Sequence, residues 1–382
     1  MSAPKITLAF VGDVMLTRPL DMLKSPDRAA HIRRLTDTAD FAIANLEMAL
    51  PESSAPADKL STIGSDPELV GQIAECGFQA VTLANNHVMD HGPSGLLDTL
   101  AAVDCAGLLR AGAGRDFDEA VTPLRLQTAS GHHVNIVNFA CTIPPGAAAG
   151  QGRPGIAPLR VTEHYRIDPI FSQEQPGTSP WVETRVESQD LRAARDAIAK
   201  AGVAGGPVIA IIHWGVPPYW RAPFQGTLAT YQRPLAQALV RAGAWAVVGH
   251  HPHVLHGIEV IDGCPVFYSL GNFIWHPRKI DEPDGEVPLS QPAYREHWLA
   301  ARKVSAADPR KRESAFVLME WGGRKWRARI TPMILGDSGE PEPLPLESGL
   351  RILRNLASMS GELGCGLDIS GGEAVLNGEV GR

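Results

Sequence analysis

The chain has 382 residues, of which 44% are hydrophobic and 20% are charged. This composition is typical of a soluble globular protein with a substantial core, and the length admits one large domain or two ordinary ones. A net charge of -7 and an isoelectric point near 6.0 argue against a general nucleic-acid-binding surface. Short basic groups at residues 310–312 and 324–325 are interpreted as solvated turns.

The five cysteines indicate a reducing environment. They are far apart in the sequence and form no Cys-x-x-Cys pair, which argues against a disulfide framework and against a cysteine zinc site. The N-terminus enters a predicted strand without a long apolar signal core, and no apolar run approaches the roughly 20 residues of a membrane span. We therefore expect a cytoplasmic protein that is neither exported nor anchored.

In chain order, short apolar, β-branched runs alternate with segments of helical periodicity. The predicted strands are Ile6–Val11, Phe41–Ala44, Ala80–Ala84, Val134–Ala140, Val208–Ile212, Ala244–Val248, Ile258–Ile261 and Val266–Ser269. The predicted helices are Pro26–Thr38, Pro67–Cys76, Ser94–Ala106, Gln189–Ala201 and Leu228–Ala242. Glycines follow several of these helices, as expected just past a helix end. The alternation predicts a layered α/β fold.

The last third of the chain has a different pattern. Ala315–Glu320 and Lys325–Ile334 are predicted strands, joined by a hairpin-type turn at residues 321–324. With residues 258–269 they predict a second, more antiparallel sheet. Leu350–Leu363 is predicted to be the final helix, and the glycine-rich tail after it is expected to be loose.

Two segments fit neither pattern. The first covers residues 143–180 and the second residues 276–292, and both are rich in proline. Long irregular loops inside a compact domain are usually functional lids or disordered segments. The sequence shows no internal repeat and no linker that would divide the chain into independent domains.

Polar side chains follow five of the predicted strands directly, and their residue types suit a metal. These residues are Asp13, then Asn45 and Glu47, then Asn85, Asn86 and His87, then His213, and finally His250, His251 and His253. In open α/β sheets, ligands bind outside the carboxyl ends of the strands, so we expect these side chains to meet at one edge. A mixture of Asp, Glu, Asn and His favours zinc, manganese or iron over copper(I) or an iron–sulfur cluster.

Each of these segments has a simpler interpretation when it is taken alone. Asp13 after Gly12 can be a turn residue or a helix cap. His213 lies within an apolar run and can be a hydrogen-bonded core histidine. The group at residues 250–253 can be a polar turn that happens to be rich in histidine. The metal hypothesis depends on all five segments occurring together.

The ordered motifs resemble those of the capsule-synthesis CapA family, which acts in poly-γ-glutamate biosynthesis. The motifs are Gly12–Leu16, Asn45–Glu47, Asn85–His87 with Asp90 and Gly92, His213–Gly215, His251–Val254 and Ser269–Phe273. A weaker likeness extends to about residue 364. This family is similar to the calcineurin-like metallophosphoesterases. The resemblance implies a four-layer αββα sandwich with a dinuclear site for manganese, iron or zinc, in one domain over residues 1–364 with a loose tail over residues 365–382.

The phosphoesterase pattern implies a role for each site residue. Asp13 and His253 bind the first metal, Glu47 bridges both, and Asn86, His213 and His251 bind the second. His87 protonates the leaving group and Asp90 orients it. The alternative for His87 is a histidine at a helix start, bonded to backbone.

This chain departs from the phosphoesterase pattern at several positions. Met15 stands where those enzymes have a histidine ligand, so the first metal loses one ligand. Glu47 replaces an aspartate and lengthens the bridge. Many CapA relatives have an acidic residue shortly after His-Trp-Gly, where this chain has residues 216–219, and the membrane anchor of capsule-synthesis members is missing.

Further residues are expected to contact the substrate or to support the ligands. Tyr219 and Arg221 are candidates for substrate contact because arginine clamps phosphate or carboxylate, although the aromatic side chains near them can equally be core. The supporting residues are Asn45, Asn85, His250 and Asn272.

The sequence thus predicts a metal-dependent hydrolase in which metal-activated water attacks a phosphoester. Its expected partner is a small-molecule or peptide-like anionic substrate, with no nucleic acid and no membrane span, and the oligomeric state is not indicated. One alternative is amide or γ-glutamyl peptide hydrolysis or transfer at the same metal site. Another is a non-catalytic accessory protein of polymer biosynthesis, which the exchange at Met15 favours.

Overall fold

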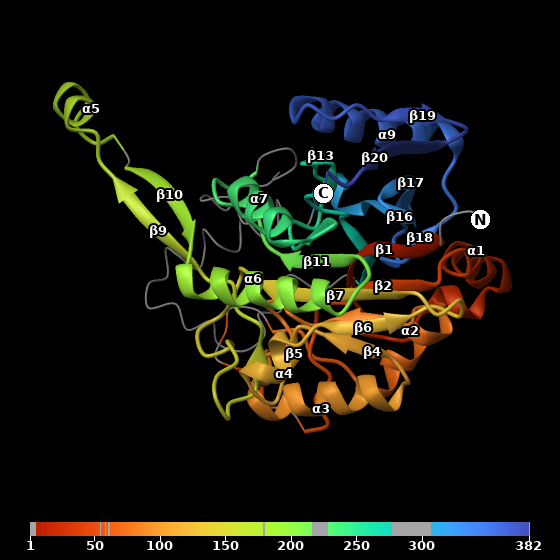
Figure 1. Cartoon of the computed structure of the whole chain (residues 1–382). Helices are drawn as coiled ribbons and strands as arrows, with labels where there is room; N and C mark the ends of the chain where they lie inside the picture. Colours follow the sequence, from red (N-terminus) through yellow and green to blue (C-terminus); the bar gives the residue numbers. More distant parts are fainter. Residues whose placement is uncertain are drawn as a thin grey trace.

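The computed structural model describes residues 5–53, 55–57, 59, 62–178, 180–215, 228–276 and 307–381, and within these residues the protein is a mixed α/β structure (Figure 1). Its larger sheet has the order β19-β20-β17-β16-β1-β2-β3-β4, with β15 beside β1 and β18 beside β17. The bounds are β1 Lys5–Met15, β2 Phe41–Leu46, β3 Ala80–Thr82, β4 Leu109–Ala111, β15 Asn272–Trp275, β16 Glu313–Gly322, β17 Lys325–Leu335, β18 Pro341–Glu342, β19 Asp368–Ser370 and β20 Glu373–Glu379.

A second sheet has the order β13-β14-β12-β11-β7-β6. Its strands are β6 Leu124–Gln127, β7 His133–Ala140, β11 Val208–His213, β12 Ala246–His250, β13 Ile258–Ile261 and β14 Cys264–Phe267. The remaining strands of the described residues form two separate two-stranded sheets. They are β5 Ala113–Gly114 with β8 Gly155–Ile156, and β9 Val161–Arg166 with β10 Trp181–Val186.

The two large sheets share one core. In β1, Leu8 and Phe10 are buried in the same cluster as Ile211 and Val247 of the second sheet. Ala9, between them, belongs to a separate cluster with the helices on the other side. Successive side chains of a strand point to opposite faces, so an uninterrupted apolar run is what a strand covered on both faces requires.

Helices cover the outer faces of both sheets. The helices of the described residues are α1 Pro26–Thr36, α2 Gly71–Glu75, α3 Gly92–Cys105, α4 Phe117–Val121, α5 Pro169–Glu174, α6 Ser188–Val203, α7 Gln232–Ala242 and α9 Leu346–Glu362, with 3-10 turns η1 Asp21–Lys24, η2 Pro67–Val70 and η3 Pro309–Arg312. Helices α1, α2 and α3 supply Ile32, Ile73 and Leu100 to the cluster on the larger sheet. Helices α6 and α7 supply Ile198 and Leu239 to the cluster that includes the second sheet. Within the described part of the chain, no helix is long and apolar enough to cross a membrane.

The alternating pattern predicted the central elements well. Each of the eight strands expected before residue 270 has a counterpart, and the hairpin at residues 315–334 is formed by β16 and β17. The sheet expected from this hairpin and residues 258–269 is wrong, because β16 joins β1 whereas β14 joins β12 in the other sheet. The expected helices are also present, although Pro67–Cys76 is divided into η2 and α2. The helix expected from Leu228 begins at Gln232 instead.

The expectation of a loose C-terminal tail is wrong. Strand β20 pairs antiparallel with β17 along its whole length and with β19 through a tight hairpin. Gly371 and Gly372 form the two-residue turn, both with positive φ, which is the conformation that favours such hairpins. Ala374 and Leu376 are buried against the core. The glycine pair was the signal that indicated a turn rather than a loose end.

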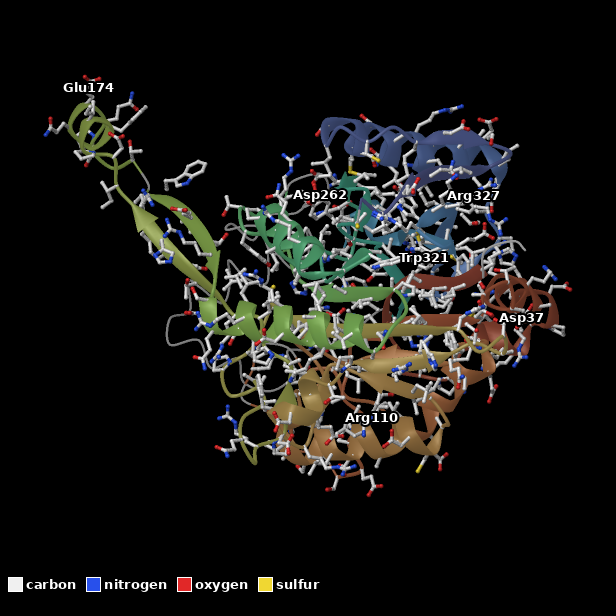
Figure 2. The ribbon with its side chains drawn as sticks, viewed as in Figure 1. Asp37, Arg110, Glu174, Asp262, Trp321 and Arg327 are labelled. Atoms are coloured by element: carbon white, nitrogen blue, oxygen red, sulfur yellow. The ribbon has the colours of Figure 1, made fainter. Side chains whose placement is uncertain are left out.

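The segment at residues 143–180 is only partly irregular. Strand β8 lies within it, and β9 begins an antiparallel hairpin with β10 that carries the short helix α5 between its strands. This hairpin projects from the body of the molecule, with Glu174 near its tip (Figure 2). Exposed aromatic residues Tyr165, Phe171 and Trp181 lie on this projection. Of the second expected loop, residues 276–292, only His276 lies among the described residues.

The Glu340 side chain caps the N-terminus of η1. Its buried carboxylate accepts hydrogen bonds from the backbone amides of Asp21, at 2.9 Å, and Met22, at 2.7 Å. The residue before η1, Leu20, supplies no side-chain cap. Burial alone would raise the pKa of Glu340, but His276, whose Nε2 lies 3.5 Å from Oε1, and the hydrogen bonds from the two amides hold it below its ordinary value of 4.5. The ionised carboxylate therefore stabilises this 3-10 turn.

We expect Glu340→Gln to lower the free energy of unfolding by about 1–3 kcal/mol at pH 7. A group with a lowered folded pKa contributes stability above its unfolded pKa and loses it as the pH falls through the folded value. The deficit of the variant should therefore shrink below about pH 4.5. Urea unfolding at pH 7 and pH 4 measures this, with exposed Glu362→Gln as a control expected to change little. An equal deficit at both pH values would contradict the assignment.

Candidate metal centre

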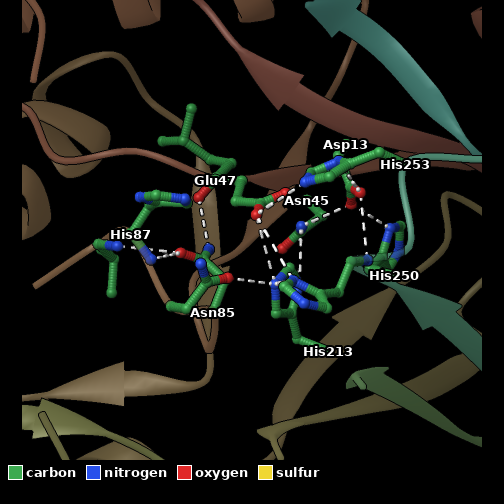
Figure 3. Close-up of polar contacts among 12 residues, drawn as sticks. Asp13, Asn45, Glu47, Asn85, His87, His213, His250 and His253 are labelled. Carbon is green, nitrogen blue, oxygen red and sulfur yellow. Dashed lines mark hydrogen bonds and ion pairs between the residues drawn. The ribbon is translucent and has the colours of Figure 1, made fainter. Parts of the chain in front are cut away.

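The carboxyl ends of the parallel strands bring the predicted site residues together (Figure 3). The site draws on both sheets, because β1, β2 and β3 are parallel neighbours in one and β7, β11 and β12 in the other. Asp13 lies near the end of β1, Asn45 and Glu47 at the end of β2, Asn85–His87 after β3, His213 at the end of β11, and His250 at the end of β12. His251 and His253 follow in the next loop.

Glu47 is a buried carboxylate without hydrogen bonds. Its side chain has no exposed surface, and neither carboxylate oxygen has a hydrogen-bond partner. Oε1 lies 3.4 Å from His213 Nε2, 3.6 Å from His253 Nε2 and 4.0 Å from His251 Nδ1. Burial, and then the nearby carboxylates of Asp13 and Asp90, raise the pKa of Glu47 well above its ordinary value. A buried group of this kind needs a partner, and a cation would supply it.

Asp13, in contrast, is fully hydrogen-bonded. Its Oδ1 accepts from Asn45 Nδ2 at 2.8 Å and from His250 Nδ1 at 2.9 Å. Its Oδ2 accepts from the backbone amide of His251 at 3.1 Å and lies 3.1 Å from His253 Nδ1. Burial would raise the pKa of Asp13, but the hydrogen bonds from His250 and His253 outweigh it and hold the pKa well below its ordinary value. Asp13 is thus ionised in the buried site.

The backbone between His251 and His253 is strained. His251 has φ of 100° and His253 has φ of 58°, which are conformations that residues with a side chain rarely adopt. Such conformations cost on the order of 1–3 kcal/mol each and persist where surrounding contacts enforce them. Here the contacts are the His251 amide on Asp13 and the Asn272 Nδ2 group on the His253 carbonyl at 3.1 Å. In this conformation His251 Nδ1 lies 4.0 Å and His253 Nε2 lies 3.6 Å from Glu47 Oε1.

Asn272 fixes the orientation of His253. Its Oδ1 accepts from His253 Nδ1 at 2.9 Å, while its Nδ2 donates to the His253 carbonyl. Since Nδ1 is engaged by Asn272 and Asp13, Nε2 is the nitrogen that faces Glu47. Asn272 reaches this position because β15 pairs in parallel with β1, with Asn272 opposite Asp13. A histidine held in this way is prepared for ligation through Nε2.

His213 faces other potential ligands rather than core groups. Its Nε2 lies 2.7 Å from Asn86 Oδ1 and 3.0 Å from His251 Nδ1, and its Nδ1 lies 3.4 Å from Asn45 Nδ2. Burial, and then the neighbouring His251, lower the pKa of His213 well below its ordinary value. Burial, and then His253, lower the pKa of His251 to about 3. Both rings are neutral at pH 7, which is the form that binds metal.

The arrangement fits a divalent metal site. Two groups of carboxylate and imidazole ligand atoms each lie within 4.8 Å of one another, one formed by Glu47, His251 and His253 and the other by Asp13, Glu47 and His213. Glu47 belongs to both groups, as a bridging ligand would. The grouping differs from the sequence expectation, which put His253 with Asp13 and His251 with His213. Nitrogen and oxygen donors of this kind suit zinc, manganese or iron.

His87 lies beside the candidate ligands and bonds to a carboxylate. Its Nδ1 donates to Asp90 Oδ2 at 2.6 Å, so the observed contact is with a side chain rather than with backbone. Asp90 also pairs with Lys59, whose ammonium donates to the Asn86 carbonyl at 2.6 Å. Burial lowers the pKa of His87, and the hydrogen bond with Asp90 opposes this effect. Lys59 was not predicted, because its stretch of sequence has no periodicity or motif.

The remaining predicted residues support the site in different ways. Asn85 braces its own loop, because Oδ1 accepts from the amides of His87 and Val88 and Nδ2 donates to the Leu46 carbonyl. His250 is buried and contacts Asp13. Met15 is buried in the cluster under α1–α3. Tyr219 and Arg221 lie outside the described residues.

Comparison with known proteins identifies the family. The model of the bacterial capsule synthesis protein PGA_cap matches residues 7–277. The chain belongs to this capsule synthesis family. The matched range extends from β1 to the end of β15 and contains Asp13, Glu47, His213, His253 and Asn272. Strands β16, β17 and β20, which complete the larger sheet, lie beyond it.

Several relatives carry names connected with capsule polymers. The PGA biosynthesis protein CapA of Bacillus subtilis is 28% identical over 277 residues, which are 71% of this chain and 63% of that protein. A probable polyglutamine synthesis accessory protein of Mycobacterium tuberculosis is 29% identical over 63% of this chain and 57% of its own length. An uncharacterized protein of Sinorhizobium fredii is 25% identical over 95% of this chain and 91% of its own. The match thus spans less than two thirds of the length of CapA.

Among solved structures, GAP50, the anchor in the inner membrane complex of Plasmodium, aligns with 96% of this chain and 98% of its own chain. The sequence identity is 9% and the TM-score is 0.36.

Proposed function

We propose that this member of the capsule synthesis family is a metal-dependent hydrolase that cleaves a phosphoester. The observation that supports it most is Glu47, a fully buried carboxylate without hydrogen bonds that three imidazoles face. The proposal includes a dinuclear site of manganese, iron or zinc and a four-layer αββα sandwich of the metallophosphoesterase type. Two packed sheets with helices on both outer faces are consistent with that classification.

The proposed roles follow from the contacts of each residue. Asp13, Glu47, Asn86, His213, His251 and His253 would hold the metal, which supplies activated water and stabilises charge on the phosphoester oxygens. Asn45, His250 and Asn272 fix the orientation of Asp13 and His253. His87, as an imidazolium, gives the proton on Nε2 to the leaving oxygen while Nδ1 donates to Asp90, whose charge favours the protonated ring against the effect of burial.

The names of the relatives favour a second candidate, amide or γ-glutamyl chemistry at the same centre. The Bacillus protein is named for PGA biosynthesis. The Mycobacterium protein is named as an accessory of polyglutamine synthesis, which also keeps a non-catalytic role as an alternative outcome. For the location of the protein we propose the cytoplasm, since the five cysteines are far apart in the sequence and form no Cys-x-x-Cys pair.

Metal analysis tests the centre directly. We expect protein purified without chelator to contain near-stoichiometric manganese, iron or zinc, and the double variant His251→Ala/His253→Ala to lose at least about 90% of it. The control His31→Ala/His164→Ala removes two histidines from α1 and β9 and should leave the metal content unchanged. Absence of metal from the wild type, with unchanged folding of the double variant, would contradict both enzymatic proposals. A panel of phosphomonoesters, phosphodiesters and γ-glutamyl amides then separates the two.

A further inference from the structure

Asn138 is a buried asparagine of β7 that links the two large sheets. Its side chain is 3% exposed, and its Nδ2 donates to the Ile211 carbonyl of β11 at 3.0 Å. Its Oδ1 accepts from the backbone amides of Leu83, at 3.2 Å, and Ala84, at 2.7 Å, in the segment that follows β3. Strands β7 and β11 belong to the second sheet and β3 to the larger one, so one side chain connects the backbone of both.

Two of the backbone groups that Asn138 contacts lie two residues before a candidate metal ligand. Ala84 precedes Asn86 in the loop after β3, and Ile211 precedes His213 on β11. These two ligands meet across the sheets, with Asn86 Oδ1 2.7 Å from His213 Nε2. The hydrogen bonds of Asn138 therefore fix the distance between the loop and β11 close to the point where the ligands meet.

Gly112 leaves the space that this contact requires. A Cβ atom at position 112 would overlap with Asn138 Oδ1 and would lie 2.8 Å from the Ala84 amide nitrogen. The φ of Gly112 is 95°, a conformation that residues with a side chain rarely adopt. A buried amide without an acceptor costs free energy, so without Asn138 the loop would have to move to find another partner.

We propose that Asn138 is a positioning residue of the candidate metal centre, which holds the loop of Asn86 and His87 at a fixed distance from His213. This rests on the proposed function, in which Asn86 and His213 bind the same metal. Groups that orient ligands typically account for roughly 10- to 100-fold in metal affinity, because they fix the positions of the ligand atoms. Asn138 thus acts on metal affinity through the backbone of two ligands, without contacting the metal itself.

Asn135, three residues earlier on β7, offers a matched control. It is 1% exposed, and its Nδ2 donates to the carbonyls of Ala201, at 3.3 Å, and Gly205, at 2.9 Å. It lies toward the amino end of the strand, whereas the candidate centre lies at the carboxyl ends. Loss of either asparagine removes buried hydrogen bonds, so Asn138→Leu and Asn135→Leu should both be destabilised in urea unfolding.

Calorimetric titration of the full chain with manganese, and separately with zinc, after removal of chelator tests the proposal. We expect Asn138→Leu to weaken metal binding roughly 10- to 100-fold and Asn135→Leu to change it less than about twofold. Hydrogen exchange of the metal-free samples, followed by mass spectrometry, should be faster over residues 84–88 in Asn138→Leu than in Asn135→Leu, because the Ala84 amide loses its acceptor. If Asn138→Leu does not fold, the smaller pair Asn138→Ala and Asn135→Ala replaces the leucine variants.

Unchanged metal affinity in the Asn138 variant, or an equal loss in the Asn135 variant, would overturn the proposal. Failure of the proposed function has a different signature, because the exchange measurement needs no metal. A wild type that binds neither manganese nor zinc would reject the hydrolase. In that case faster exchange over residues 84–88 would still assign the hold on the loop to Asn138, and unchanged exchange would overturn that assignment too.

Discussion

Replacing Glu47 by glutamine is expected to remove bound metal and hydrolysis together without destabilising the metal-free protein. The carboxylate is shared by both groups of potential ligands, so its loss affects every metal position. Residues that merely orient ligands typically account for 10- to 100-fold in metal affinity or activity, so we expect hydrolysis to fall at least about 100-fold. In chelator the melting temperature should not fall, because the neutral amide removes repulsion from Asp13 and Asp90.

The second part of this test compares how much added metal stabilises the wild type and Glu47→Gln against unfolding. Manganese or zinc at about 100 times its dissociation constant should stabilise the wild type by about 2.7 kcal/mol, and Glu47→Gln hardly at all. Glu75→Gln, an exposed change at the end of α2, serves as the control for loss of one carboxylate. If Glu47→Gln bound metal as the wild type does, the buried carboxylate would not be a ligand.

Replacing His87 by alanine is expected to lower turnover by about 10²- to 10⁴-fold while the metal stays bound. The loss should depend on the leaving group. An alkyl alcohol needs a proton as the bond breaks, whereas p-nitrophenol leaves readily as an anion, so p-nitrophenyl phosphate should be hydrolysed with a much smaller loss. Steady-state rates on the two substrates, together with metal analysis, measure the effect.

Asp90→Asn is a second variant for the same test, and its loss of turnover should be smaller than that of His87→Ala. It keeps the shape of the side chain but removes the charge that His87 Nδ1 contacts, so an intermediate loss of roughly 10- to 100-fold is expected. His31→Ala, on α1, is the control for loss of a histidine outside the site. Equal losses on both substrates in His87→Ala would assign the residue to structure rather than to proton transfer.

The sequence predicted which residues of the candidate site lie directly after the ends of strands. Asp13, Glu47, His213 and His251 each follow a strand whose apolar run was evident. Parallel pairing aligns the strand ends within each sheet, and the packing of the two sheets brings the two sets together. No knowledge of side-chain directions was needed for this expectation, because it depends on the position of the chain at the edge of the sheet.

Other features depend on contacts that the sequence does not display. Lys59 and Lys311 come from irregular segments, and only the folded chain shows which carboxylate or ring each one meets. The projecting hairpin of β9 and β10 was missed because its charged and apolar residues show little alternation, and several of its side chains are exposed. Asn85 was predicted to support the site, and the structure shows that it does so by bracing the loop that carries Asn86 and His87.

The position of β1 has a consequence for the order in which the protein can fold. Its antiparallel partner is β16, with Lys5 opposite Gly322, so β1 leaves the ribosome long before the strand that it pairs with on that side. At typical rates of synthesis the interval is on the order of tens of seconds. During that time the edge of β1 that β16 covers has no partner, and Leu8 and Phe10 lack part of their core. Until β16 is made, the nascent chain thus carries an unpaired strand edge, which is a feature that favours association with other chains.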